Sequence, residues 1–509
     1  MSGKEDRSRV PLSRAVGAGV GVIGLVTLVI GLQSGPARLQ PATPAFVNAD
    51  RPGINAHNSP SVARSGPALI ALADRIDTPR FSCSVSLSTT GGDTWRPLPL
   101  PLPAEAPNCH QPDVAFDADN RLLVLYTATG GQFNQPVGVW LQRFDGEAPM
   151  GPPVRVAPAE AFHARMAVDG RRVWVTWVQV DGAAEMPLGF GSTPSPVRMA
   201  RSVDGGATFA APTTVSDGRR VVQPTPVSVG GERVVVGAFD LAGDFENYEA
   251  RHAGQGGRPT DDRWRVVSWT SADGGTTFAA PVTVAGDLAV PARIIVNLSP
   301  APGFARDPSA EGRLYATWDA GQGDGRDVFL ARSDDAGATW SRSVPVASGP
   351  RGQFLPAVGV APTGRVDVVL YDRSADVDDV RASVTLASSD DRGRTFRTAI
   401  ISDAPFDTRI GFGSLQGIPL LGSRLAVLSE TDRALAFWSD TSRGTIDDNV
   451  QDLAAVSVDV EGAGRRRPAL VVPGALLLAL GLAGLAGLLG GGPAVVARLR
   501  PGDRGPQQA

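Results

Sequence analysis

An eight-residue pattern recurs along the chain as SVDGGATF at 202–209, SADGGTTF at 271–278, SDDAGATW at 333–340 and SDDRGRTF at 389–396. Each copy reads Ser-x-Asp-x-Gly-x-Thr-aromatic. A fifth copy, STTGGDTW at 88–95, keeps the frame but has Thr90 in place of the Asp. The equivalent positions 90, 204, 273, 335 and 391 are 114, 69, 62 and 56 residues apart, so the first interval holds two units. Repeats of this period predict a propeller or a solenoid.

The pattern predicts a hairpin turn. An Asp side chain can accept hydrogen bonds from nearby backbone amides, and Gly adopts the positive φ that a tight turn requires. The Thr hydroxyl can bind the returning strand, and the aromatic residue can pack between neighbouring sheets. We therefore expect a structural role for the four Asp residues of the pattern, Asp204, Asp273, Asp335 and Asp391.

Short strands surround each copy of the pattern. RVDVVLYDR at 365–373 and RVWVTWVQV at 172–180 are rich in β-branched residues and are bounded by Gly, Pro and Asp, as strands are. Seven units can be traced, at about 58–103, 110–157, 162–217, 221–287, 291–348, 353–403 and 410–460. We therefore predict an all-β fold of seven blades over 58–460, in which the first and last units meet because radial closure removes exposed sheet edges.

The octapeptide is the Asp-box, and the chain resembles the sialidase-like β-propeller superfamily. In that superfamily each box lies at the turn between the third and fourth strands of a blade. Sialidases have six blades, so the resemblance leaves a six-bladed closure open. It also implies that substrate binds on the opposite face, where the second strands end.

Asp residues recur at the predicted ends of the second strands. Five of them would surround the mouth of the central channel, namely Asp74, Asp240, Asp319, Asp372 and, more loosely, Asp440. One interpretation is a ring of carboxylates that recognises sugars, polyols or cations; the other is that each Asp caps its own loop. A polar, Gly-rich insert that begins at Leu241 lies on the same face and is either a lid or a surface loop.

Sialidase chemistry, as the resemblance implies it, needs three arginines for the substrate carboxylate, a Tyr nucleophile paired with a Glu, and an Asp acid/base. The only candidates at a suitable strand end are Tyr371, Asp372 and Arg373, and a second Tyr, Tyr248, stands between two Glu residues of the insert. Arg351, Arg373 and Arg409 are candidates for the arginine clamp. The family's Arg-Ile-Pro segment has no good match; the nearest is DRIDTPR at 74–80.

An apolar stretch lies near each end of the chain. Residues 15–32 are uncharged and follow a basic 1–14, and residues 468–497 precede the basic 498–509. Their length predicts two transmembrane helices, with a signal peptide as the alternative for the first. The expected order is cytoplasmic tail, helix, linker at 33–57, propeller outside the cytoplasm, helix and second tail, in the cell membrane.

Composition excludes several classes of protein. The net charge is −4 and basic and acidic residues are intermixed, so no nucleic-acid partner is expected. The two cysteines and four histidines lack zinc-site spacing, and we expect neither a metal nor another cofactor. In an oxidising compartment Cys83 and Cys109 would form a disulfide; two buried free thiols are the alternative.

Two functions follow from these observations. The first is a membrane-anchored, glycan-directed propeller that binds sugars or has exo-sialidase or related glycosidase activity. The second is a non-catalytic scaffold of the cell envelope, in which the propeller face binds another protein.

Overall fold

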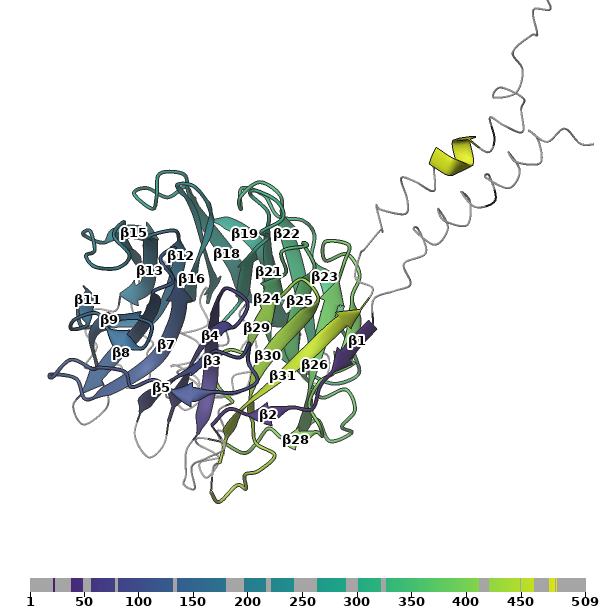
Figure 1. Cartoon of the computed structure of the whole chain (residues 1–509), viewed down its shortest axis with the longest axis horizontal. Helices are drawn as coiled ribbons and strands as arrows, with labels where there is room; N and C mark the ends of the chain where they lie inside the picture. Colours follow the sequence, from purple (N-terminus) through teal and green to yellow (C-terminus); the bar gives the residue numbers. More distant parts are fainter. Residues whose placement is uncertain are drawn as a thin grey trace, which may run out of the picture. The chain divides into compact units, whose positions relative to one another are not determined.

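A computed structural model describes residues 22, 38–48, 56–77, 81–130, 135–179, 196–216, 221–241, 263–289, 301–321, 326–411, 421–448, 450–461, 476–480 and 482. The chain divides into two units, Leu39–Glu461 and the two terminal segments together. The first unit contains seven antiparallel sheets, set around one axis in sequence order (Figure 1). The prediction of an all-β propeller is therefore confirmed, with seven blades and not six.

Each blade is a meander whose first strand is innermost. Blade 1 contains β3 (His57–Ser65), β4 (Leu69–Ile76), β5 (Ser82–Ser88) and β6 (Arg96–Pro97). Blade 2 contains β7 (Asn108–Phe116), β8 (Leu122–Gly130), β9 (Gln135–Asp145), β10 (Ala148–Pro149) and β11 (Val154–Ala157). Blade 3 contains β12 (Ala161–Asp169), β13 (Arg172–Gln179), β14 (Val197–Ser202) and β15 (Thr213–Ser216). Blade 4 contains β16 (Val221–Gly230), β17 (Arg233–Asp240), β18 (Arg263–Ser271) and β19 (Val282–Ala289).

The remaining three blades follow the same order. Blade 5 contains β20 (Gly303–Arg306), β21 (Leu314–Ala320), β22 (Asp327–Ser333) and β23 (Val344–Ala347). Blade 6 contains β24 (Gln353–Val360), β25 (Val366–Asp372), β26 (Arg381–Ser389), β27 (Arg397–Ile400) and β28 (Phe406–Asp407). Blade 7 contains β29 (Ala426–Ser429), β30 (Arg433–Asp440) and β31 (Asp452–Glu461), to which the N-terminal strands β1 (Arg38–Pro41) and β2 (Ala45–Phe46) are added.

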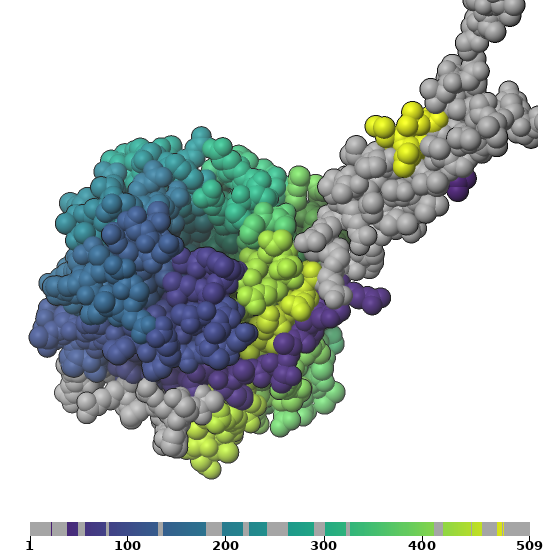
Figure 2. All heavy atoms as spheres, in the orientation of Figure 1, coloured from purple at the N-terminus to yellow at the C-terminus, as the bar shows by residue number. Residues whose placement is uncertain are grey.

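The ring is closed by strands from both ends of the propeller. β1 and β2 both pair with β31, and the pairing places Ala45 opposite Ala455. Part of the segment 33–57, which we expected to be a linker, therefore supplies the outer strands of blade 7. Figure 2 shows these purple N-terminal residues packed against the yellow C-terminal strand. Strands from the two ends of the propeller therefore share one sheet, and this closes the ring.

The Asp-box turns connect the third and fourth strands of their blades. In blade 3, the Asp204 carboxylate accepts hydrogen bonds from the Thr208 amide (3.0 Å) and hydroxyl (2.6 Å), while the Gly206 amide donates to Ser202 Oγ (2.9 Å). The same three bonds recur in blades 4, 5 and 6 around the other Asp residues of the pattern, Asp273, Asp335 and Asp391. In blade 1, Thr90 Oγ1 replaces the carboxylate and accepts from the Thr94 amide (2.9 Å).

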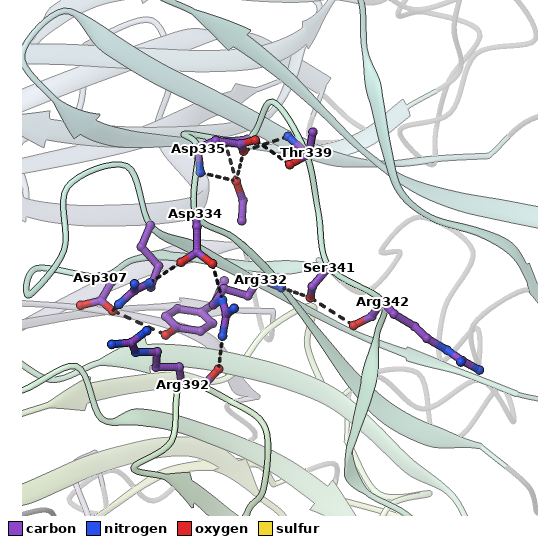
Figure 3. Close-up of polar contacts among 12 residues, drawn as sticks. Asp307, Arg332, Asp334, Asp335, Thr339, Ser341, Arg342 and Arg392 are labelled. Atoms are coloured by element: carbon purple, nitrogen blue, oxygen red, sulfur yellow. Dashed lines mark hydrogen bonds and ion pairs between the residues drawn. The ribbon is translucent and has the colours of Figure 1, made fainter.

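Polar contacts also join one box to the next blade. In blade 5, Asp335 faces Thr339 inside the turn, and the neighbouring Asp334 accepts from Arg332 Nε at 2.9 Å (Figure 3). Arg332 Nη1 also donates to the carbonyl of Arg392, in the box of blade 6, at 3.4 Å (Figure 3). The turns therefore contribute to the packing of neighbouring blades as well as to their own hairpins.

The hydrophobic core lies between the blades. Between blades 3 and 4, for example, Trp174 packs with Val236 and Trp269. The aromatic residue of each box joins such a cluster between two blades, at Trp95, Phe209, Phe278, Trp340 and Phe396. The predicted packing of these rings between neighbouring sheets is therefore observed.

Replacing Gly206 with alanine is expected to lower the free energy of unfolding by about 2 kcal/mol or more. A residue with a Cβ costs about 1–2 kcal/mol at a positive φ. Overpacking against a neighbouring side chain costs about 1–3 kcal/mol. Gly206 has φ +77, and an added Cβ would lie 2.2 Å from Leu141 Cδ2 in blade 2. Gly146→Ala is the matched control, because Gly146 has φ +58 but an added Cβ would meet no atom within 4 Å. Urea unfolding of the full chain measures both; equal losses in the two variants would contradict the inter-blade contact.

The predicted transmembrane helices are not borne out. Among the residues that the structure describes, no helix is long and apolar enough to cross a membrane. A span needs about 20 consecutive helical residues, and the longest described helical run in these segments is 476–480. The flanking helices predicted at 15–32 and 468–497 are therefore corrected, and most of both segments, like the tails at 1–14 and 498–509, lies outside the described residues.

The predicted disulfide is confirmed. Cys83 in β5 is bonded to Cys109 in β7, with a Cα–Cα distance of 5.7 Å. The bond joins blade 1 to blade 2 on the face where the second strands end.

Candidate binding site at the entry face

Antiparallel pairing brings two sets of residues to one face of the propeller. The first residue of an inner strand lies opposite the last residue of the second strand, as with His57 and Ile76 in blade 1 and Gln353 and Asp372 in blade 6. We call the face that these residues form the entry face. It lies opposite the Asp-box turns.

The predicted carboxylate ring is at this face, but four of its five members are buried. The relative exposures of Asp74, Asp240, Asp319 and Asp440 are 2, 4, 2 and 6%. Asp74 binds His57 Nδ1 at 2.6 Å, Asp319 lies 3.3 Å from Arg326, and Asp440 accepts from Trp438 Nε1 at 2.9 Å. Burial raises the pKa of Asp319. Carboxylates held in this way stabilise their own blades and do not form an open ring around the channel.

The members of the predicted catalytic trio are held by local partners. Tyr371 is fully buried, its hydroxyl donates to the Ser439 carbonyl at 2.9 Å, and burial raises the pKa of the phenol. Asp372 accepts from the amide (2.8 Å) and hydroxyl (2.5 Å) of Ser374, two residues later, so it caps its own loop. Arg373 lies over the Phe354 ring at 4.8 Å and donates to Thr408.

The arginines that we expected to form a clamp are held by local partners. Arg351 donates to the Val377 carbonyl at 2.8 Å, and Arg409 binds Asp407 through two nitrogens at 2.6 and 3.0 Å. Tyr248 and the rest of the insert beyond Leu241 lie outside the described residues.

A bulge near the start of the inner strands carries other buried polar side chains. The pairing register shifts between Asn58 and Ser61 in blade 1, and an equivalent shift occurs in blades 2, 3, 4 and 6. Each bulge contains one non-glycine residue with positive φ, and these are Ser59, Gln111, His163, Gln223 and Leu355. The first four are polar and buried.

Three arginines from three different blades converge beside these bulges. Arg75 is the last but one residue of β4 in blade 1, Arg165 lies in β12 of blade 3, and Arg424 precedes β29 in blade 7. Arg424 reaches across the inner strands, where it donates to the carbonyls of Pro60 (3.0 Å) and Pro112. We call Arg75, Arg165 and Arg424 the arginine cluster.

Two carboxylates contact the arginine cluster. Asp77 Oδ2 accepts from Arg75 Nη2 at 2.6 Å, and both side chains are essentially inaccessible to solvent. Asp113 Oδ2 accepts from Arg165 Nε at 3.1 Å. Although burial favours the neutral carboxyl, the pKa of Asp113 is lowered because Arg165 and Arg424 lie beside it. Among the residues that the structure describes, three guanidinium groups therefore face two carboxylates.

The excess of positive charge in the arginine cluster affects the pKa of Arg424. Burial, together with Arg165 and Arg75, lowers the pKa of Arg424 to about 9. Arg424 is 6% exposed, whereas the Arg165 side chain is 17% exposed and offers the cluster a route to solvent. A buried cation that lacks a matched counter-ion favours an incoming anion.

Two histidines complete the site. His110 accepts a hydrogen bond from Arg75 at 3.1 Å through Nε2, and its ring contacts Phe81 edge-on at 5.4 Å. His163 occupies one of the bulges and is 3% exposed. Burial lowers the pKa of His163 to about 4, and burial with the nearby Arg75 lowers the pKa of His110 well below its usual value. Both imidazoles are therefore neutral at pH 7.

No tyrosine of the described residues lies among these groups. Tyr126 donates to the Pro101 carbonyl at 3.0 Å, and Tyr315 approaches Asp307 at 3.5 Å, on the Asp-box side of blade 5. The described part of the site therefore has the groups needed to bind a carboxylate and lacks the Tyr–Glu pair of a sialidase.

The sequence held a signal for this site that our interpretation did not use. Ser59, Gln111 and Gln223 each precede a proline near the start of an inner strand. Arg75 belongs to the DRIDTPR segment, which is the nearest but a poor match to the Arg-Ile-Pro segment of the sialidases. The structure places it at the end of a second strand, which reaches the same face.

Comparisons with known proteins show a likeness of fold. No family model and no curated protein matches the chain. Solved structures that are similar include an ulvan lyase of the polysaccharide lyases, with 13% identity, a TM-score of 0.49 and coverage of 81% of this chain and 95% of the lyase. A Hadza microbial sialidase has 13% identity, a TM-score of 0.43 and coverage of 77 and 73%. An α-L-arabinofuranosidase from Fusarium graminearum has 11% identity, a TM-score of 0.40 and coverage of 84 and 98%. All are β-propellers, and at these identities the similarity concerns the fold alone.

Proposed function

We propose that the protein is a glycan-binding propeller that takes a carboxylated sugar at the arginine cluster of its entry face. The observation that supports this is the convergence of Arg75, Arg165 and Arg424 against two carboxylates in the described part of the chain. A guanidinium group binds a carboxylate through two parallel hydrogen bonds, and such charge-assisted bonds are stronger in a poorly solvated site. Buried Ser, Gln and His side chains around the cluster are suitable partners for sugar hydroxyls.

Binding is favoured over hydrolysis. The exo-sialidase version of the function needs an accessible nucleophile, and the Tyr371 hydroxyl is buried and bound to a backbone carbonyl. The scaffold alternative needs a large exposed apolar patch. Among the described residues of the propeller, the large exposed hydrophobics Val203, Val377, Ile400 and Ile446 lie on separate loops and strands. We therefore place a protein-binding role second.

We also propose that the propeller works outside the cytoplasm. The Cys83–Cys109 disulfide supports this location, because such bonds persist in oxidising compartments. Protein taken from cells under thiol-blocking conditions should contain no free thiol, and two blocked thiols would contradict the location.

Titration of the full chain with 3′-sialyllactose, trigalacturonate and neutral lactose tests the binding proposal. We expect an acidic sugar to bind and lactose not to bind. Arg165→Gln should weaken binding by about 10-fold or more, since a hydrogen bond to a charged group contributes about 1.5–3 kcal/mol. Arg165→Lys keeps the positive charge but loses the planar guanidinium group that donates two parallel hydrogen bonds. This variant should bind the acidic sugar with intermediate affinity.

Arg172→Gln is the matched control for this experiment. Arg172 also pairs with carboxylates, Asp169 and Glu232, but it lies in β13 at the end remote from the entry face. The Arg172→Gln variant should therefore bind the acidic sugar with unchanged affinity. Equal binding of lactose, or no binding of either acidic sugar, would refute the proposal, and release of dye from a fluorogenic sialoside would favour the catalytic version.

A further inference from the structure

His110 is held neutral by its hydrogen-bond partner. Arginine has five N–H donors and no acceptor, so the bond between Arg75 Nη1 and His110 Nε2 requires that Nε2 carry no proton. Arg75 is itself fixed by Asp77, at 2.6 Å from its other terminal nitrogen. The imidazole can therefore gain a proton at Nε2 only if it separates from Arg75.

The charged groups that face His110 oppose that proton. Arg75 comes from β4, Arg424 from the segment before β29, and His163 from β12; all three lower the pKa of His110, after burial itself. Asp113, on the same strand as His110, already accepts hydrogen bonds from Ser61 (2.5 Å) and Arg165 (3.1 Å). Both carboxylate oxygens of Asp113 are therefore already engaged.

We propose that His110 takes up a proton when a carboxylated ligand binds to the arginine cluster, so that binding is coupled to acidification. The inference rests on the proposed function and adds its regulation. A bound carboxylate adds a negative charge beside Arg75 and Arg424, which removes the repulsion that keeps His110 neutral. It also offers an acceptor to Arg75, which frees His110 Nε2 to receive a proton from solvent. His110 as a residue is partly exposed to solvent.

Thermodynamic linkage between proton binding at His110 and ligand binding gives the direction in which the affinity changes with pH. If the bound ligand raises the pKa of His110, then a proton on His110 raises the affinity for the ligand by the same factor. Between the pKa of His110 in the free protein and its higher pKa in the complex, the affinity for the ligand increases by up to about tenfold for each unit that the pH falls. The sugar carboxylate stays ionised down to about pH 4, so the ligand does not titrate in this range.

Calorimetric titration of the full chain at pH 7.5, 6.5 and 5.5 tests the coupling. The probe is 3′-sialyllactose or trigalacturonate, whichever binds in the experiment above. We expect the affinity to rise by about three- to tenfold from pH 7.5 to 5.5. Titrations at pH 5.5 in two buffers with different ionisation heats should show uptake of up to one proton per ligand. Thermal melts at each pH establish that the chain is folded.

Two variants identify the group that takes up the proton. His110→Gln keeps a carbonyl oxygen that can accept from Arg75 but cannot titrate, so it should bind with an affinity that does not change with pH. His163→Gln should keep the pH dependence. Binding without proton uptake, or a pH dependence lost in His163→Gln and kept in His110→Gln, would overturn this inference while the proposed function stands. Absence of binding at every pH would instead remove the proposed function.

Discussion

Replacing Asp367 with alanine is expected to lower the free energy of unfolding by about 3–5 kcal/mol, because it leaves a buried guanidinium group without its counter-ion. Arg365 and Asp367 are 1 and 0% exposed. Arg365 Nε and Nη2 donate to the carboxylate at 3.0 and 2.9 Å. The same guanidinium donates to the carbonyls of Glu430, Thr431 and Arg433, so the pair also joins blade 6 to blade 7.

Chemical unfolding of the full chain measures this loss, and Asp334→Ala is the matched control. Asp334 also accepts hydrogen bonds from two arginines, Arg313 (2.6 Å) and Arg332 (2.9 Å), but its side chain is 50% exposed (Figure 3). Solvent screens an exposed pair, so the control should lose about 1 kcal/mol or less. Similar losses in the two variants would show that burial does not decide the contribution of these pairs.

Acidification from pH 6.5 to 4 is expected to lower the free energy of unfolding by about 3 kcal/mol through His163 alone. Burial lowers the pKa of His163 in the folded chain from 6.5 to about 4. The unfolded chain therefore binds the proton more readily, and the stability that the neutral ring confers is present above pH 6.5. It is lost progressively as the pH falls toward 4.

His163→Gln separates this effect from the titration of other groups. Glutamine is polar and can still hydrogen-bond at this position, but it does not ionise. Unfolding midpoints of the full chain at pH 7, 6, 5 and 4 should fall less steeply in the variant, with a difference in slope that approaches one proton. Parallel curves for the two proteins would contradict a buried neutral His163.

Local sequence was sufficient to predict the repeating part of the fold. An Asp-box turn is formed by hydrogen bonds within five residues, from Ser202 to Gly206 and from Asp204 to Thr208. Its residue types therefore reveal it without knowledge of the neighbours, and the five copies, with the strands around them and between them, predict seven blades. The same locality explains why the box in blade 1 was recognised although Thr90 replaces the Asp.

Local sequence was not sufficient to distinguish an open site from a buried one. Asp74, Asp319 and Asp440 stand at strand ends, as the pattern predicted, yet their partners His57, Arg326 and Trp438 are what decide that they are satisfied and buried. The burial of Tyr371 could not be predicted for a related reason. The Ser439 carbonyl that binds its hydroxyl belongs to the next blade, 68 residues away.

What the sequence determined by itself was the all-β propeller, its repeated turns and the disulfide, since these depend on short-range residue patterns or on the presence of only two cysteines. The N-terminal strands that complete blade 7 and the arginine cluster were decided only by the tertiary structure. Arg75, Arg165 and Arg424 are 90 and 259 residues apart, and only closure of the ring brings their blades around one channel. Charges that distant in sequence influence one another because the fold places them together in a poorly solvated space.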